Sequence, residues 1–110
     1  MANKKTVKIG DLTQLTRPVS ISEDEQILVR PLTLKEMVSL FFDSRDAFLA
    51  LYQAGVEGAT PESLAPFLLT APELVAKIIA IASDDPGSAK SVENHLPGTV
   101  QLIALHEVWQ

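Results

Sequence analysis

Cysteine is absent from this sequence of 110 residues, and its absence excludes disulfide bridges, thiolate metal sites and cysteine nucleophiles. Histidine is scarce as well, and neither His95 nor His106 lies in a spacing that binds a metal ion. Glu93 and Glu107 are close to them in sequence, but near neighbours on a helix point apart, and no third group orients an acid–base pair. We expect His106, which follows apolar Leu105, to be a partly buried structural residue.

Motifs of catalysis and cofactor binding are missing too. The five glycines are scattered and form neither a G-x-G-x-x-G fingerprint nor a Walker A loop. The acidic stretch SEDEQ lacks the alternate spacing and closing glutamate of a calcium loop, and no serine lies in a G-x-S-x-G turn. The sequence therefore predicts no catalytic residue, no cofactor and no metal site, and we expect a protein that is not an enzyme.

Basic charge is in short supply, because nine Lys and Arg residues face fourteen Asp and Glu residues, for a net charge of −5. The first twenty residues carry Lys4, Lys5, Lys8 and Arg17 against Asp11, a net +3, so the other ninety sum to −8. Nucleic-acid binding requires clustered Lys and Arg side chains, so the acidic body argues against it. The basic arm has no aromatic residue, and we expect it to be a solvated tail.

Long hydrophobic runs are also absent. The apolar runs are far shorter than a membrane-spanning helix, and the N-terminal lysines are not followed by the apolar stretch of a secretory signal. An apolar share of 46% is normal for a globular protein, and 110 residues suffice to bury one core. We expect one soluble cytosolic domain with neither a membrane nor a nucleic acid as partner.

The elements that the sequence does specify begin with β-prone segments. Residues 26–32, QILVRPL, form a short apolar run that Pro31 ends. A polar turn, SEDE, precedes this run. Further β-prone residues lie before the turn at Val7, Ile9, Val19 and Ile21. The pattern predicts a small N-terminal β hairpin or edge sheet, confined to the first thirty-two residues.

A long helix is predicted over residues 33–54. Thr33 and Glu36 form a T-x-x-E capping box, in which each side chain satisfies a backbone donor at the helix start. Apolar residues then recur at helical spacing along one face: Leu34, Met37, Val38, Phe41, Phe48 and Tyr52. Gly55 is a natural end for this helix.

Three further helices are expected near residues 61–69, 72–83 and 98–109. Thr70 and Glu73 repeat the T-x-x-E pattern ahead of the second of them. That second helix is apolar nearly all round, which predicts packing on two sides. The fold class is therefore mainly α, with about four helices and a small N-terminal β element.

One loop and one internal division follow from the same pattern. The stretch SDDPGSAKS, residues 83–91, predicts a loop. Residues 1–25 are interpreted as an N-terminal arm with its β-prone segment, and residues 26–110 as the helical part of a single domain.

Apolar residues exceed what one core-facing stripe requires. Phe41 and Phe42 are adjacent on one helix and cannot both face the same way. One interpretation is a generous core with a few exposed apolar side chains. We favour a second interface, for a partner or for self-association into homo-oligomers. The candidate partner-binding residues are Phe42, Leu49, Leu51, Val108 and Trp109.

The residues from about 26 to 109 resemble the tail assembly chaperones of long-tailed bacteriophages, which are encoded just upstream of the tape-measure protein. Three pieces carry the resemblance. The first is VRPLTLKE, where an Arg-Pro-Leu-Thr turn precedes a helix. The second is APELVAKIIAIA. The third is LPGTVQLIALHEV, where a proline starts a helix with Leu102 and Leu105. None of the three is a catalytic signature.

The resemblance implies a function that needs no active site. Such proteins coat the long, aggregation-prone tape-measure protein, keep it soluble and recruit tail-tube subunits to it. They act in the cytoplasm of the bacterial host and leave before the virion is complete. They are commonly made in a short form and in a longer form that arises when some ribosomes slip frame near the end of the short reading frame. An interrupted final helix, ending on Trp109, would fit such a junction.

Two other functions remain open from the sequence. The chain could be a small structural protein of the head–tail joint or tail that stays in the virion. It could also be a bacterial protein-interaction module unrelated to phage. Retention in purified virions would separate the first of these from a chaperone, and genomic neighbours would separate the second.

Overall fold

The computed structural model describes residues 16–58 and 60–108, and its first element is a β hairpin. Strands β1 (Arg17–Ser20) and β2 (Gln26–Val29) pair antiparallel, with Arg17 opposite Val29. The turn between them closes where the backbone N–H groups of Ile21 and Ser22 donate to the Glu25 carbonyl. The predicted hairpin is thus confirmed in the described part, while the β-prone residues Val7 and Ile9 lie outside it.

Helices α1 (Leu34–Asp43) and α2 (Arg45–Val56) occupy the segment that the sequence predicts as one helix. That prediction is wrong at Ser44, whose φ of −148° and ψ of 64° leave the helical region. Serine tolerates such cap positions because its short polar side chain favours helix ends over helix interiors. The break reorients the chain, so that Leu40 before it and Leu51 after it are both buried in the core.

Helices α3 (Pro61–Thr70) and α4 (Pro72–Ala82) follow, and each has a proline in its first turn. The predicted capping box of Thr70 and Glu73 is wrong, because Thr70 belongs to the last turn of α3, where its hydroxyl donates to the Pro66 carbonyl at 3.0 Å. Ala71 caps α4 instead, without a side-chain hydrogen bond. Proline at the first helical position suits both starts, since its missing N–H would have no partner there.

Six α-helices are present among the described residues, two more than expected. The additional break at Ser44 gives one. The other is α5 (Ala89–His95), which begins inside the predicted loop of residues 83–91 and extends past its end. A 3₁₀ turn, η2 (Pro86–Ser88), precedes it within the same loop. Tertiary packing overrides weak local propensity here, because Val92 and Leu96 turn toward the core.

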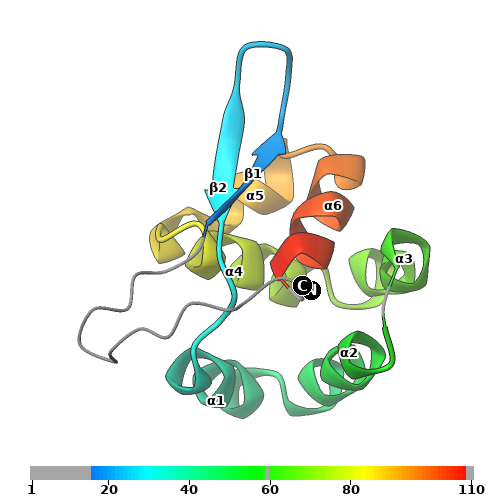
Figure 1. Ribbon diagram of the computed structural model, residues 1–110. Helices are drawn as coiled ribbons and strands as arrows, with labels where there is room; N and C mark the ends of the chain where they lie inside the picture. Colours follow the sequence, from blue (N-terminus) through cyan, green and yellow to red (C-terminus); the bar gives the residue numbers. More distant parts are fainter. Residues whose placement is uncertain (1–15, 59, 109–110) are drawn as a thin grey trace, which may run out of the picture.

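Helix α4 is the centre of the molecule. The sequence predicted packing on two sides from its continuous apolar character, and the helix contacts α3, α5, α6 (Gly98–Val108) and β2. Figure 1 shows the hairpin and α5 on one side of α4, with α1 and α2 side by side at the opposite end. In the described ranges no single helix is long and apolar enough to span a membrane. Helices α3 and α4 taken together have the length and composition of a membrane span, but a bend of 118° separates them.

Candidate partner-binding surface

An apolar groove runs between α1 and α2, with a volume of about 260 Å³. Its walls are almost entirely apolar. They are formed by Leu34, Met37, Val38, Phe41, Phe48, Leu49 and Tyr52. Both helices are short and amphipathic, and because each faces the core with only part of its apolar stripe, the remainder lines this groove.

The outer edge of the groove on α1 is highly exposed. Phe42 is 79% exposed and Leu34 is 74% exposed, and Val38 lies between them with 45%. These three residues are spaced by four, so they form one row along the helix. A contiguous row of this kind differs from the isolated exposed apolar residues that any surface carries.

Aromatic contacts fix the shape of the groove. The rings of Phe41 and Phe42 meet edge to face with centroids 5.8 Å apart, and those of Phe48 and Tyr52 stack at 6.3 Å. The guanidinium of Arg45 lies 5.7 Å from the centroid of the Phe41 ring, a cation–π contact at the α1–α2 junction. Aromatic rings therefore form a large part of the groove's wall.

The structure separates the sequence-predicted partner-binding residues. Phe42 borders the groove through the contact of its ring with Phe41 in the wall, and Leu49, 46% exposed, lies in the wall itself. Leu51 and Val108 are instead buried in the core, because α2 turns Leu51 inward after the break at Ser44 and α6 packs Val108 against the centre. These two positions are corrected from surface to core. Trp109 lies outside the described residues.

Three exposed residues of the groove were missed as partner-binding candidates: Leu34, Val38 and Tyr52. The signal that could have found Leu34 and Val38 is their spacing of four residues with Phe42 on one helix. It was interpreted as part of a core stripe. Sequence periodicity identifies an apolar face but does not reveal whether another element covers it.

A buried arginine anchors α1 beside the groove. Arg30 is 5% exposed, and its Nη1 and Nη2 donate to the two carboxylate oxygens of Glu36 at 2.8 and 2.7 Å. Its Nε donates to Asp84 Oδ1 at 3.0 Å, and its remaining donors reach the carbonyls of Pro31 and Ile81. Paired carboxylates and carbonyls compensate the cost of burying this charge.

Glu36 serves the arginine and the helix start together. Its Oε1 also accepts from the Thr33 N–H at 2.8 Å, while the Thr33 hydroxyl accepts from the Glu36 N–H, which confirms the predicted capping box. The hydrogen bonds from Arg30 lower the pKa of the Glu36 carboxyl to about 2, against the opposing effect of burial. The same pair raises the pKa of the guanidinium above its usual range.

The third partner, Asp84, comes from the predicted loop. It has a φ of 59°, in the left-handed region that aspartate tolerates better than most residues. The backbone N–H of Arg30 donates to the Ala82 carbonyl at 3.0 Å, so both the backbone and the side chain of the residue after β2 are bonded to the end of α4 and the turn that follows it. The cluster therefore fixes the start of α1 to the centre of the molecule.

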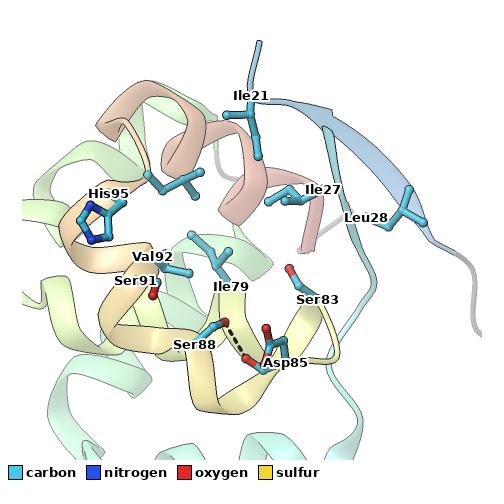
Figure 2. A pocket seen from close by; sticks show the side chains of 11 residues that line it. Ile21, Ile27, Leu28, Ile79, Ser83, Asp85, Ser88, Ser91, Val92 and His95 are labelled. Atoms are coloured by element: carbon cyan, nitrogen blue, oxygen red, sulfur yellow. Dashed lines mark hydrogen bonds between the residues drawn. The ribbon is translucent and has the colours of Figure 1, made fainter. Parts of the chain in front are cut away.

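A second hollow, of about 580 Å³, lies between the hairpin, the end of α4 and α5. Figure 2 shows Ile21 and Ile27 entering it from the hairpin and Val92 from α5, while the Ser88 hydroxyl donates to the Asp85 carbonyl at 2.7 Å. His95 and Asp85 lie at different edges of the hollow. It therefore brings no acid next to a base.

A comparison with known protein families decides the relationship. A family model described as pre-tape measure protein matches residues 8–110 of the chain. The chain belongs to this family. No curated protein and no solved structure matches it.

Membership of the pre-tape measure family associates the chain with phage tails, in the tape-measure region. The three sequence pieces that carry the resemblance to tail assembly chaperones all lie within the matched residues. The coarser part of that resemblance is therefore confirmed. The chaperone activity, the partners and the frameshifted longer form stay predictions.

Proposed function

We propose that this protein is a tail assembly chaperone, which binds the tape-measure protein, keeps it soluble and helps to recruit tail-tube subunits. The observation that carries the proposal is the apolar groove between α1 and α2, on a member of the pre-tape measure family. A chain in the process of folding or assembly exposes apolar surface that aggregates unless it is covered. An exposed apolar groove is the surface that such a task requires.

The groove is suited to one face of an amphipathic helix. Helix-in-groove recognition uses apolar side chains at positions i, i+3, i+4 and i+7 of the bound helix, which insert between two helices of the binding protein. Helix α1 has ten residues and is about 15 Å long, so one copy covers roughly three turns of a client helix. Many copies would then be needed along a long tape measure.

Binding through one small groove is weak, and occupancy along a long client comes from the number of copies. The release that assembly requires follows from the same property, because tube subunits that cover more surface displace weakly held modules one at a time. In this proposal the protein acts in the host cytoplasm and is absent from the finished virion. A structural tail protein, the alternative function, would instead be retained.

Co-expression with the tape-measure protein tests the proposal. Wild-type protein should raise the soluble fraction of the tape measure and copurify with it. Phe42→Asp, which places a charge at the edge of the groove, should reduce recovery of the complex at least about tenfold, since a charge cannot enter an apolar contact without a partner. Leu69→Asp is the matched control, because Leu69 is 87% exposed but lies on α3, away from the exposed apolar row of α1 that borders the groove.

Two results would reject the chaperone. One is a tape measure that stays equally insoluble with and without this protein. The other is a stable presence of this protein in purified virions, which would favour the structural alternative. A complex that forms equally with Phe42→Asp would retain the function and exclude the groove as its site.

A further inference from the structure

Two charged residues of opposite sign lie on the exposed face of α1. Lys35 lies in the first turn and Asp43 is the last residue. The N-terminus of a helix carries partial positive charge and the C-terminus partial negative charge, so Lys35 opposes the field of α1, whereas Asp43 lies between the C-terminus of α1 and the N-terminus of α2. Within residues 16–58 and 60–108 neither forms an ion pair.

Their positions are symmetric about a small residue. Ser39 lies four residues after Lys35 and four before Asp43, and all three are exposed in one row of the helix surface. Each charge is therefore about 6 Å along the axis from Ser39. This row lies next to the apolar row of Leu34, Val38 and Phe42, which forms the edge of the groove.

We propose that α1 pairs antiparallel with α1 of a second copy of this chain, about a two-fold axis near Ser39. In that arrangement Lys35 of each copy lies opposite Asp43 of the other, because both are the same distance from the axis. Each charge also meets the helix end that attracts it. One pairing therefore gives both exposed charges of each copy a partner of opposite sign, and a two-fold interface makes the contact twice.

The same pairing covers the apolar edge of the groove. Phe42 of one copy comes next to Leu34 of the other, and these are the two most exposed apolar residues of α1. Ser39 at the axis is small enough for the two helices to approach closely. The charge pattern selects this occupant, because an unrelated helix would have to match both signs at that spacing, whereas a second copy does so by symmetry.

This inference rests on the proposed function and adds regulation to it. A chaperone with an open apolar groove must itself avoid aggregation while no client is present. Reciprocal covering of the groove edge protects the free protein, and a client helix competes with the second copy for the same residues. A contact made by one helix of ten residues from each copy is small, so the dimer is weak and can be displaced.

Charge reversal tests the interface by sedimentation equilibrium over a wide range of protein concentration. Lys35→Asp and Asp43→Lys should each weaken dimerisation at least about tenfold, because each turns both ion pairs of the dimer into repulsion. The double variant, with both charges exchanged, should recover the wild-type association. An equimolar mixture of the two single variants should also associate, since both acidic side chains of the Lys35→Asp variant then face lysines of the Asp43→Lys variant.

Recovery in the mixture cannot come from altered folding of either variant, so it is the decisive result. A wild-type protein that is strictly monomeric would overturn the inference, as would single variants that dimerise as well as wild type or a mixture that stays monomeric.

Client binding separates the proposed self-pairing from the proposed chaperone function. If the tape measure is solubilised by a protein that never dimerises, the chaperone function stands and self-pairing is wrong. If the dimer behaves as expected and no client binds, the function is wrong.

Discussion

Helices α4 and α1 are both apolar, yet they occupy opposite environments. Seven of the eleven residues of α4 are buried, against one of the ten residues of α1. Helix α4 contacts three helices and a strand, whereas the main neighbour of α1 is α2. The difference lies in the coverage that the fold provides, so an apolar helix face becomes either core or binding surface according to what packs on it.

The two ends of the molecule also differ in how they are held. The centre is stabilised by buried aliphatic side chains, which contribute in proportion to the apolar area they remove from water. The α1–α2 pair is held by contact between the two helices, by packing of α2 on α3, by Leu40, Phe48 and Leu51 in the core, and by the Arg30 cluster at the start of α1. A surface that binds and releases partners is well placed on the less extensively packed end.

The largest expected effect is the loss of stability when one large apolar side chain of each helix is replaced by alanine. Ile78→Ala in α4 should cost about 2–5 kcal/mol of unfolding free energy, because Ile78 is fully buried and its removal leaves a cavity. Phe42→Ala should change stability by less than about 0.5 kcal/mol despite the larger side chain, since Phe42 is 79% exposed. Urea denaturation measured at low protein concentration checks both. Equal destabilisation by the two substitutions would show that Phe42 is packed within one chain.

Acid titration measures how much the Arg30–Glu36 ion pair, which holds the start of α1, contributes to the stability of the fold. The folded-state pKa of Glu36 is about 2, below its ordinary 4.5, so the carboxylate stabilises the fold above pH 4.5. That contribution, up to about 3 kcal/mol, is lost as the pH falls from 4.5 toward 2. Glu36→Gln keeps the capping box, since glutamine also serves there, and removes the ion pair. It should be less stable than wild type at pH 7, with a difference that shrinks toward pH 2.

Asp84→Asn is the matched control for this titration. The Asp84 side chain is 59% exposed, so its ion pair with Arg30 is screened by water and should contribute less than about 1 kcal/mol. Asparagine also tolerates the left-handed backbone at this position. If both variants lost the same stability at pH 7, the assignment of the main pairing to Glu36 would be wrong.

The sequence predicted local features well, because they depend on residues close together in the chain. The hairpin follows from a polar turn between β-prone runs, and the capping box follows from Thr33 and Glu36 alone. The break at Ser44 was missed because serine permits a helix interior as well as a cap, and only packing of Leu40 and Leu51 into one core selects the break.

The candidate surface was only partly predictable for the same physical reason. Phe42 and Leu49 were found because they lie beside the apolar stripe that the predicted helix turns toward the core. Leu51 was misplaced because the predicted helix was continuous, and a continuous helix gives a different face after residue 44. The contact of Arg30 with Asp84 joins residues 54 positions apart, and no local pattern reveals it.

The smallest expected effect concerns the stability of the monomer. One charge substitution in α1 that weakens the dimer should make the single chain more stable. Lys35→Asp places an anion in the first turn of α1, so the substitution complements the helix dipole. It should stabilise the monomer by about 0.3–1 kcal/mol, while weakening the dimer. Asp43→Lys should bring no such gain, because residue 43 lies between the C-terminus of α1 and the N-terminus of α2, whose fields oppose each other. Thermal unfolding at a concentration where wild type is monomeric measures both variants directly, and the gain from Lys35→Asp should shrink in high salt because the charge is exposed and screened. A loss of stability in Lys35→Asp would mean that the lysine has a favourable contact within its own chain, and that its wild-type placement needs no second copy to explain it.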